Sequence, residues 1–274
     1  MNGRICILGA GNMGRALVGG LLRSGMRPEQ LNVGEKHLAA RTTLARDFGV
    51  SALADNSAAA AGAAVVVLAV KPQDVVATLS GLAGLFAGQR PLVVSVAAGV
   101  RIATLQGACG AGTAVVRAMP NRPALVGAGI TGLYAAGEVS TAQRASAQSV
   151  LGSVGETVWV PTEEALDVVT ALSGSGPAYF FLLAELLAEA GESLGLEAPA
   201  ARRLANATLY GSGLLAHAAD ADLKRLRAEV TSAGGTTEAA VRVFESAGLR
   251  ATVTQALVAA AQRSRDLAAV TGNP

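Results

Sequence analysis

The sequence of 274 residues is poor in the residue types on which several protein classes depend. It has two cysteines, two histidines and only 3% aromatic residues. The cysteines are Cys6, inside an apolar run, and Cys109, in a glycine-rich segment, and they make neither a disulfide framework nor a metal site. We therefore expect a reducing, cytoplasmic location and no bound metal.

Long hydrophobic runs are also missing, although 51% of the residues are hydrophobic. The longest apolar run, residues 58–70, is too short and too rich in alanine to span a bilayer. No charged segment followed by an apolar one opens the sequence, so we expect no secretion signal. Basic runs with interleaved aromatic residues are absent, which makes nucleic acid a poor partner. We expect a globular protein that binds neither membrane nor nucleic acid.

The pattern of apolar residues divides the chain into two parts. Up to residue 160, short apolar runs alternate with segments of helical spacing, which predicts an α/β fold with a parallel, doubly wound sheet. The expected strands are residues 4–8, 31–34, 65–70, 92–96, 113–117, 129–134 and 157–160. After Pro161 such runs almost disappear. There we expect helices over residues 177–194, 198–220, 222–231, 237–247 and 249–270.

The helical part is rich in Ala, Leu and Gly. In residues 177–194, Phe180, Leu183 and Leu187 recur at helical spacing, while glutamates such as Glu185 share the other side. Helices of this composition have close-packing faces to spare. The sequence therefore predicts an obligate oligomer with a helical interface.

The most informative segment is a glycine turn near the start of the chain. Residues 4–8 form an apolar run that leads into Gly9, Gly11 and Gly14, spaced as G-x-G-x-x-G, and a helical pattern follows. Gly9 allows a tight turn, Gly11 lets amides approach a pyrophosphate, and Gly14 lets the helix lie close to the sheet. With Asn12 and Met13, these residues are predicted to bind a dinucleotide. The alternative, a purely structural turn, explains the flanking pattern less well.

The end of the second expected strand bears on which dinucleotide binds. Glu35 lies where an acidic side chain binds the adenosine ribose hydroxyls, which favours NADH. Lys36 and Arg41 follow, and either can pair with the 2′-phosphate of NADPH. Solvent-exposed charges at a strand end are the third interpretation. NADPH and NADH both stay candidates.

Two further expected strands end in residues that suit a cofactor edge, because ligands gather at the carboxyl ends of strands in open α/β sheets. Proline pre-sets the first helical turn after the third strand and so holds the preceding lysine at the junction. A plain surface lysine is the alternative. Small residues follow the fourth strand, where a nicotinamide or ribose could pass. The candidates are Ala69, Val70, Lys71, Pro72, Ala97, Ala98 and Gly99.

A glycine-rich segment in the helical part offers a second binding loop. Two glycines lie between hydroxyl residues and lead into a helix, so consecutive amides and hydroxyls can wrap a carboxylate. Helix capping is the alternative, but capping does not need Gly-Gly between four hydroxyl residues. The candidate substrate residues are Ser232, Gly234, Gly235, Thr236 and Thr237.

Taken together, these segments resemble pyrroline-5-carboxylate reductase, and the resemblance runs end to end. It rests on residues 9–14, 70–73, 117–121, 172–179 and 230–237. It implies a Rossmann-like domain over 1–160 and a helical dimerisation and substrate-binding domain over 161–274, often in a ring of dimers. It also implies cofactor contacts at Asn56. One departure is Ala233, where the family usually has proline; this should loosen the loop slightly.

The resemblance implies reduction of the cyclic imine 1-pyrroline-5-carboxylate to L-proline by hydride from NADPH or NADH. Such a reaction needs alignment rather than a strong acid, base or metal. We expect Thr237 to be the catalytic residue, its hydroxyl hydrogen-bonding the ring nitrogen while solvent supplies the proton. His37 and His217 have no partner at catalytic spacing in the sequence and are expected to be structural.

Two rival functions are weighed against this one. A hydroxyacid dehydrogenase of the same plan would place a lysine on the helix after the interdomain glycine motif, and residues 177–194 contain none. A catalytically silent dinucleotide-binding module would not need residues 232–237. Reduction of a C=N bond is therefore favoured.

Overall fold

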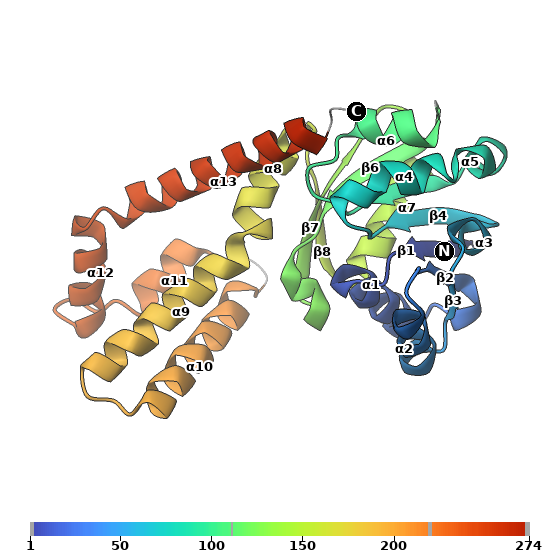
Figure 1. The fold of residues 1–274 in the computed structure, drawn as a ribbon. Coiled ribbons are helices and arrows are strands. Elements are labelled where there is room, and N and C mark those ends of the chain that lie inside the picture. The colour runs from blue at the N-terminus through green and yellow to red at the C-terminus, as the bar shows by residue number, and fades with distance from the viewer. Residues whose placement is uncertain (1–2, 111, 219–220, 272–274) are drawn as a thin grey trace. The chain divides into compact units, whose positions relative to one another are not determined.

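A computed structural model describes residues 3–110, 112–218 and 221–271 (Figure 1). By internal packing the chain divides into two compact units. Unit 1 comprises residues 1–175 and 260–274, and unit 2 comprises residues 176–259. The domain division expected after residue 160 lies inside unit 1 by this criterion, and it stays a prediction about which segments share a function.

Unit 1 is built on one eight-stranded sheet with the strand order β3-β2-β1-β4-β5-β6-β7-β8. The strands are β1 (Arg4–Leu8), β2 (Leu31–Gly34), β3 (Ser51–Leu53), β4 (Ala63–Leu68), β5 (Leu92–Ser95), β6 (Ala114–Met119), β7 (Gly129–Ala135) and β8 (Gly155–Trp159). The order 3-2-1-4-5-6 is that of a dinucleotide-binding Rossmann sheet. The predicted α/β class is thus confirmed.

Two details of the sheet differ from the sequence-based expectation. β7 runs antiparallel to β6, whereas all other neighbours are parallel. The connection, residues 120–128, holds only the short helix η3 (Arg122–Val126), and a parallel crossover needs a longer segment. β3 was not predicted, because its three residues are exposed or half-buried and carry no apolar run.

Apolar side chains alternate between the two faces of the sheet and form two cores. One core packs α1 (Asn12–Arg23), α2 (Leu38–Phe48) and α7 (Thr141–Gly152) against side chains such as Ile5 and Ile7. The other packs α3 (Asn56–Ala60), α4 (Val75–Ser80), α5 (Ala83–Gln89) and α6 (Ile102–Cys109) against Cys6 and Leu8. The period of two along β1 therefore fixes which helices lie on which face.

Unit 2 is entirely helical over its described residues. Its helices are α9 (Gly176–Ser193), α10 (Ala198–Ala216), α11 (Leu223–Glu229) and α12 (Thr236–Ser246), together with the first part of α13 (Leu249–Thr271). Before α9, α8 (Ala165–Val169) and the π-helical turn η4 (Thr170–Gly174) belong to unit 1. All five predicted helices are present. The predicted end of the second, at Ala219 and Asp220, lies outside the described residues.

Candidate functional site

The glycine turn of unit 1 is shaped by close backbone approach. Gly9 has φ +103°, and a Cβ on it would come within 2.6 Å of the carbonyl oxygen of Ala69. A Cβ on Gly14 would overlap the carbonyl oxygen of Gly9. On Gly11, by contrast, a Cβ would meet no described atom within 4 Å. Because α1 begins there with unpaired first-turn amides, the open space over Gly11 fits the pyrophosphate of a dinucleotide.

Glu35 is directed at this turn. Its carboxylate accepts hydrogen bonds from the backbone N–H of Ala10 (2.9 Å) and that of His37 (2.8 Å). The Nη1 of Arg41 donates to the carbonyl oxygens of Glu35 and Lys36, at 2.8 Å each. The negative charge therefore lies beside the glycine turn, while Arg41 is engaged in holding the loop after β2.

The other predicted cofactor residues meet at the same edge of the sheet. The Ala69 N–H donates to the carbonyl of Leu8 (2.8 Å) and the Val96 N–H to that of Leu68 (3.1 Å), which places the ends of β1, β4 and β5 side by side. The Asn56 side chain lies against Gly34 at the end of β2. The structure thus brings together Gly9, Gly11, Asn12, Met13, Gly14, Glu35, Lys36, Asn56, Ala69, Val70, Lys71, Pro72, Ala97, Ala98 and Gly99.

The predicted substrate loop of unit 2 is a turn that opens α12. Gly234 has φ +71°, and the Gly235 N–H donates to the carbonyl of Ser232 (3.0 Å). Thr236 and Thr237 are the first two residues of α12, and among the described residues their amides donate no hydrogen bond. These two N–H groups and the positive end of the helix provide an anion-binding arrangement.

Glu238 is a part of this loop that sequence reasoning missed. Its carboxylate accepts from the Gly234 N–H (2.8 Å) and lies 3.6 Å from the guanidinium of Arg242. The available signal was an acidic residue at the third helical position, which reaches back to the preceding backbone as in a capping box. The capping interpretation therefore accounts for the amide of Gly234, the Ser232 carbonyl takes that of Gly235, and the amides of Thr236 and Thr237 are left for a ligand.

Comparisons with known proteins match this chain over nearly its whole length. A family model for pyrroline-5-carboxylate reductase dimerisation matches residues 163–267, and one for coenzyme F420-dependent NADP oxidoreductase matches residues 4–99. The chain is 44% identical over 265 residues to pyrroline-5-carboxylate reductase from Pseudomonas aeruginosa, covering 97% of each, and 41% identical to that from Mycobacterium tuberculosis, covering 96% of each.

Solved structures are similar over the same length. A pyrroline-5-carboxylate reductase from Coxiella burnetii superposes with a TM-score of 0.94 at 39% identity, covering 97% of this chain and 99% of that one. The Plasmodium falciparum enzyme with NADP bound superposes with 0.82 at 26% identity, covering 97% and 98%. The chain belongs to the pyrroline-5-carboxylate reductase family. The resemblance read from the sequence is confirmed.

Two motifs of this reductase that the sequence singled out are brought together inside unit 1. Asn121 accepts from the Ile130 N–H (2.9 Å) and donates to the carbonyl of Ser173 (3.2 Å). A Cβ on Gly174 would lie 2.7 Å from the methyl group of Met119. The segment after β6 and the glycine-serine segment before α9 thus support one another.

The remaining sequence expectations concern titratable groups and the surface. His37 precedes α2 and His217 follows α10, both exposed. Burial raises the pKa of the Cys6 thiol to about 12 and also raises that of Cys109. Among the described residues no group of three or more His, Cys, Asp or Glu could hold a metal. One helical stretch, residues 165–193, is long and apolar enough to cross a membrane by length and composition only.

Proposed function

We propose that this chain catalyses the NAD(P)H-dependent reduction of 1-pyrroline-5-carboxylate to L-proline, the last step of proline biosynthesis. The observation that carries the proposal is the match to a curated relative at 44% identity over 97% of both chains. The family-model matches, over residues 4–99 and 163–267, include the glycine turn and the loop before α12. A module that only bound a dinucleotide would need the first but not the second.

The residues of unit 1 fit the cofactor. Bound NAD(P)H supplies a hydride from C4 of its nicotinamide ring. The open space over Gly11 and the first amides of α1 receive the pyrophosphate, and Glu35 lies on the ribose side of the turn. The segment of Ala97, Ala98 and Gly99 borders the nicotinamide end. These assignments are supported by the shared sheet edge and by the NADP-bound relative from Plasmodium falciparum.

The loop before α12 takes the substrate carboxylate. The amides of Thr236 and Thr237 and the hydroxyl of Ser232 supply donors, and the helix N-terminus favours the negative charge. Glu238 holds the Gly234 amide and so fixes the turn without occupying the other donors. Gly234 needs its positive φ for this turn, which a residue with a Cβ adopts only with strain.

Thr237 is the residue we assign to the reacting nitrogen. A protonated cyclic imine is already electrophilic, so the site mainly aligns the hydride and the imine carbon and fixes the carboxylate. As hydride arrives, the ring nitrogen becomes an amine that the half-buried Thr237 hydroxyl can hydrogen-bond. A threonine hydroxyl is a poor acid, and solvent supplies any further proton.

We further propose a cytoplasmic homodimer, or a higher oligomer of dimers, that binds neither membrane nor nucleic acid. Large apolar side chains are exposed along α9, where Phe180, Phe181 and Leu186 each keep more than half of their surface exposed. The family model that covers this region is a dimerisation model. A second copy is therefore the cover that we assign to the apolar stretch 165–193, rather than lipid.

The first experiment follows NAD(P)H oxidation on addition of 1-pyrroline-5-carboxylate, with NADPH and NADH in parallel. Substrate-dependent oxidation is expected. If the folded protein binds a cofactor but oxidises neither NADPH nor NADH, the proposed substrate is wrong. The protein would then reduce another imine or act as a silent binding module.

Thr237 is tested by a matched pair of substitutions. Thr237→Ala should lower kcat/KM by about 10- to 100-fold, whereas Thr237→Ser, which keeps the hydroxyl, should stay near wild type. A Thr237→Ala enzyme within about threefold of wild type, less than 1 kcal/mol of transition-state stabilisation, would remove this role.

A further inference from the structure

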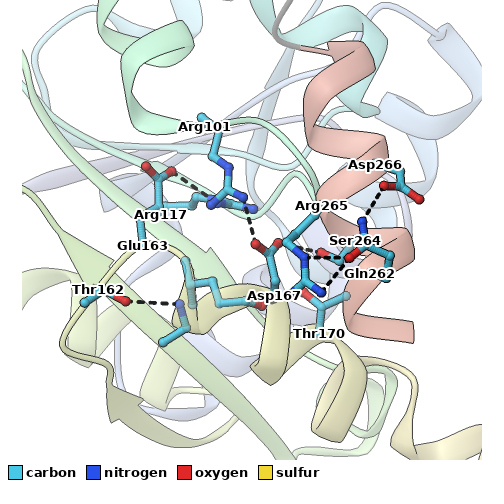
Figure 2. Close-up of polar contacts among 12 residues, drawn as sticks. Arg101, Arg117, Thr162, Glu163, Asp167, Thr170, Gln262, Ser264, Arg265 and Asp266 are labelled. Atoms are coloured by element: carbon cyan, nitrogen blue, oxygen red, sulfur yellow. Dashed lines mark hydrogen bonds and ion pairs between the residues drawn. The ribbon is translucent and has the colours of Figure 1, made fainter. Parts of the chain in front are cut away.

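Asp167 is a carboxylate inside unit 1 that the proposed reaction does not use. It lies on α8 and is fully buried. Its Oδ2 accepts from the Nη2 of Arg101 at 2.7 Å, and its Oδ1 accepts from the hydroxyl of Ser264, on α13, at 2.7 Å (Figure 2). Three segments that are far apart in the sequence therefore meet at one carboxylate.

Glu163, four residues before Asp167 and just ahead of α8, makes a second set of contacts beside it. One oxygen of its carboxylate accepts from the Nη1 of Arg117 on β6 (3.1 Å) and from the backbone N–H of Ile102 (2.8 Å). Arg117 is 3% exposed. We name the five side chains that share these contacts the Asp167 cluster: Arg101, Arg117, Glu163, Asp167 and Ser264.

The two carboxylates hold consecutive residues of one segment. Asp167 holds the side chain of Arg101, and Glu163 holds the amide of Ile102, the first residue of α6. Arg101 is the N-cap residue, and among the described residues its own side chain makes no cap hydrogen bond. Glu163 therefore takes the place of a capping side chain, supplied from more than 60 residues further along the chain.

The segment fixed in this way is the one that borders the predicted cofactor edge. Its start, directly after β5, is held to β4, because the Val96 N–H donates to the carbonyl of Leu68. Its end is held by the Asp167 cluster at Arg101. Between these points Gly99 takes φ +76°. The segment is thus anchored at its start by the sheet and by the Ala97 N–H, which donates to the Ser95 Oγ (3.4 Å), and at its end by the carboxylates of Asp167 and Glu163.

Stability alone does not account for such a cluster. Burying charges costs solvation free energy, and apolar side chains of similar volume often stabilise a core as well or better. Here two guanidinium groups face two carboxylates, and the Nη1 of Arg101 is buried without a hydrogen-bond partner among the described residues. Burial also lowers the pKa of Arg117, as expected of a cation in a poorly solvated place. Unlike an apolar core, the cluster holds particular side chains and one backbone amide in fixed orientations.

We propose that Asp167, Arg101 and Glu163 are positioning residues that hold Ala97–Ala98–Gly99 in the conformation that aligns the nicotinamide end of the cofactor for hydride transfer. This inference rests on the proposed function for the assignment of that segment. Ser264 keeps the Asp167 carboxylate in the orientation that leaves Oδ2 for Arg101. Hydride transfer tolerates little misplacement, so a small shift of the segment should lower the rate strongly.

The test is Asp167→Asn, which keeps the shape and one acceptor but removes the charge. We expect kcat to fall by about 10- to 100-fold and the Kd for NAD(P)H, measured by nicotinamide fluorescence, to rise several-fold. With cofactor deuterated at C4, the isotope effect on kcat should increase as hydride transfer becomes limiting. Arg101→Lys, which keeps the charge, should be less affected than Arg101→Met.

The matched control is Val150→Ala. Val150 lies on α7, is fully buried and packs in the core on the opposite face of the sheet. The Val150→Ala variant should lose thermal stability. Its kcat, its Kd for NAD(P)H and its isotope effect should stay within about twofold of wild type. If Asp167→Asn behaves like Val150→Ala in these three measurements, the cluster is structural only and the proposal is wrong. Should Asp167→Asn fail to fold, the same three measurements on Ser264→Ala, Arg101→Lys and Arg101→Met test the proposal.

Failure of the proposed function gives a different pattern. A wild-type protein that binds NAD(P)H but does not reduce 1-pyrroline-5-carboxylate contradicts the proposed function. The positioning proposal is then judged by the cofactor Kd of Asp167→Asn against wild type and Val150→Ala. An unchanged Kd would overturn it.

Discussion

The two units of this reductase complete their cores to very different degrees. In unit 1, α1 buries seven of its 12 residues, including Leu17, Val18 and Leu21. In unit 2, α9 buries only Gly176, Ala184 and Ala188 among 18 residues, and α11 and α12, all of whose residues are described, bury none. Unit 1 buries most of its large apolar side chains within the chain itself, whereas unit 2 leaves an apolar face exposed.

The two units therefore differ in the source of their stability, which is burial within one chain for unit 1 and association between chains for unit 2. The free energy that holds unit 1 together comes from apolar side chains already removed from water. In unit 2, side chains such as Leu183 and Leu187 still expose nearly half of their surface. Exposed apolar faces of this extent mark interaction surfaces, and a protein stabilised by its own association depends on its concentration. Substitutions in the core of unit 1 should therefore change the free energy of unfolding, whereas substitutions on the apolar face of unit 2 should change assembly.

The largest effect is expected from charges on the apolar face of unit 2. Leu183→Glu combined with Leu187→Glu places two carboxylates one helical turn apart on α9. Assembly should be lost, because an unpaired charge buried at an interface costs several kcal/mol. Light scattering should then report a monomer or aggregate, and reductase activity should fall more than about 100-fold.

The comparison between units supplies the control. Val158→Glu introduces the same kind of charge on β8 of unit 1, at a side chain 45% exposed, and should leave assembly and activity near wild type. In the Leu183/Leu187 variant, NAD(P)H binding to unit 1 should persist. A stable, fully active oligomer with both glutamates in place would contradict the proposed interface.

Leu→Ala substitutions in each unit sharpen the same contrast. Leu17 is fully buried, and Leu17→Ala should reduce the free energy of unfolding by about 2–5 kcal/mol without changing the subunit dissociation constant. Leu187→Ala should instead raise the dissociation constant, measured by dilution in sedimentation experiments. Equal effects of the two substitutions on dissociation would show that the units do not differ in this way.

The parts that could be predicted from the sequence are local. The glycine turn follows from residues 9–14 and the strand before them, and the substrate loop follows from one glycine-rich segment. The Asp167 cluster could not be predicted in this way, because Asp167 reaches Arg101 and Ser264 across 66 and 97 residues. Only the fold brings these side chains together, and no spacing or periodicity in the sequence marks them.

Glu35 could be predicted from the sequence only in part. Its position at the end of β2 was predicted, but its two backbone partners depend on the packed turn. Glu35→Gln removes the negative charge and keeps an acceptor for the Ala10 amide. The ratio of kcat/KM for NADPH to that for NADH should rise about tenfold, equivalent to about 1.4 kcal/mol, because repulsion of the 2′-phosphate is relieved.

Glu29→Gln is the matched control for this substitution. Glu29 is exposed on η1 (Pro28–Gln30), before β2, at the other end of that strand. The same loss of charge there should leave the cofactor ratio unchanged. If Glu35→Gln also leaves it unchanged, Glu35 serves only to hold the turn, and the choice between NADPH and NADH is made elsewhere.

The smallest expected effect concerns Cys6 and depends on how completely unit 1 is buried. Desolvation raises the pKa of this thiol from 9.0 to about 12 in the folded protein. Below pH 9 the thiol is protonated in both the folded and the unfolded state, so it contributes no pH dependence. Between pH 9 and 12 the unfolded chain loses a proton that the folded chain keeps, and stability falls by up to about 1.4 kcal/mol per pH unit.

Urea unfolding of wild type and Cys6→Ala at pH 8 and pH 10, at one protein concentration, measures this contribution. The wild type should lose about 1 kcal/mol more than the variant between the two pH values, since other alkaline titrations are common to both. Equal losses would mean that the thiol ionises as readily in the folded protein as in the unfolded chain. That would place water inside the core of unit 1 at β1, and the contrast between a completed core and an incomplete one would not hold there.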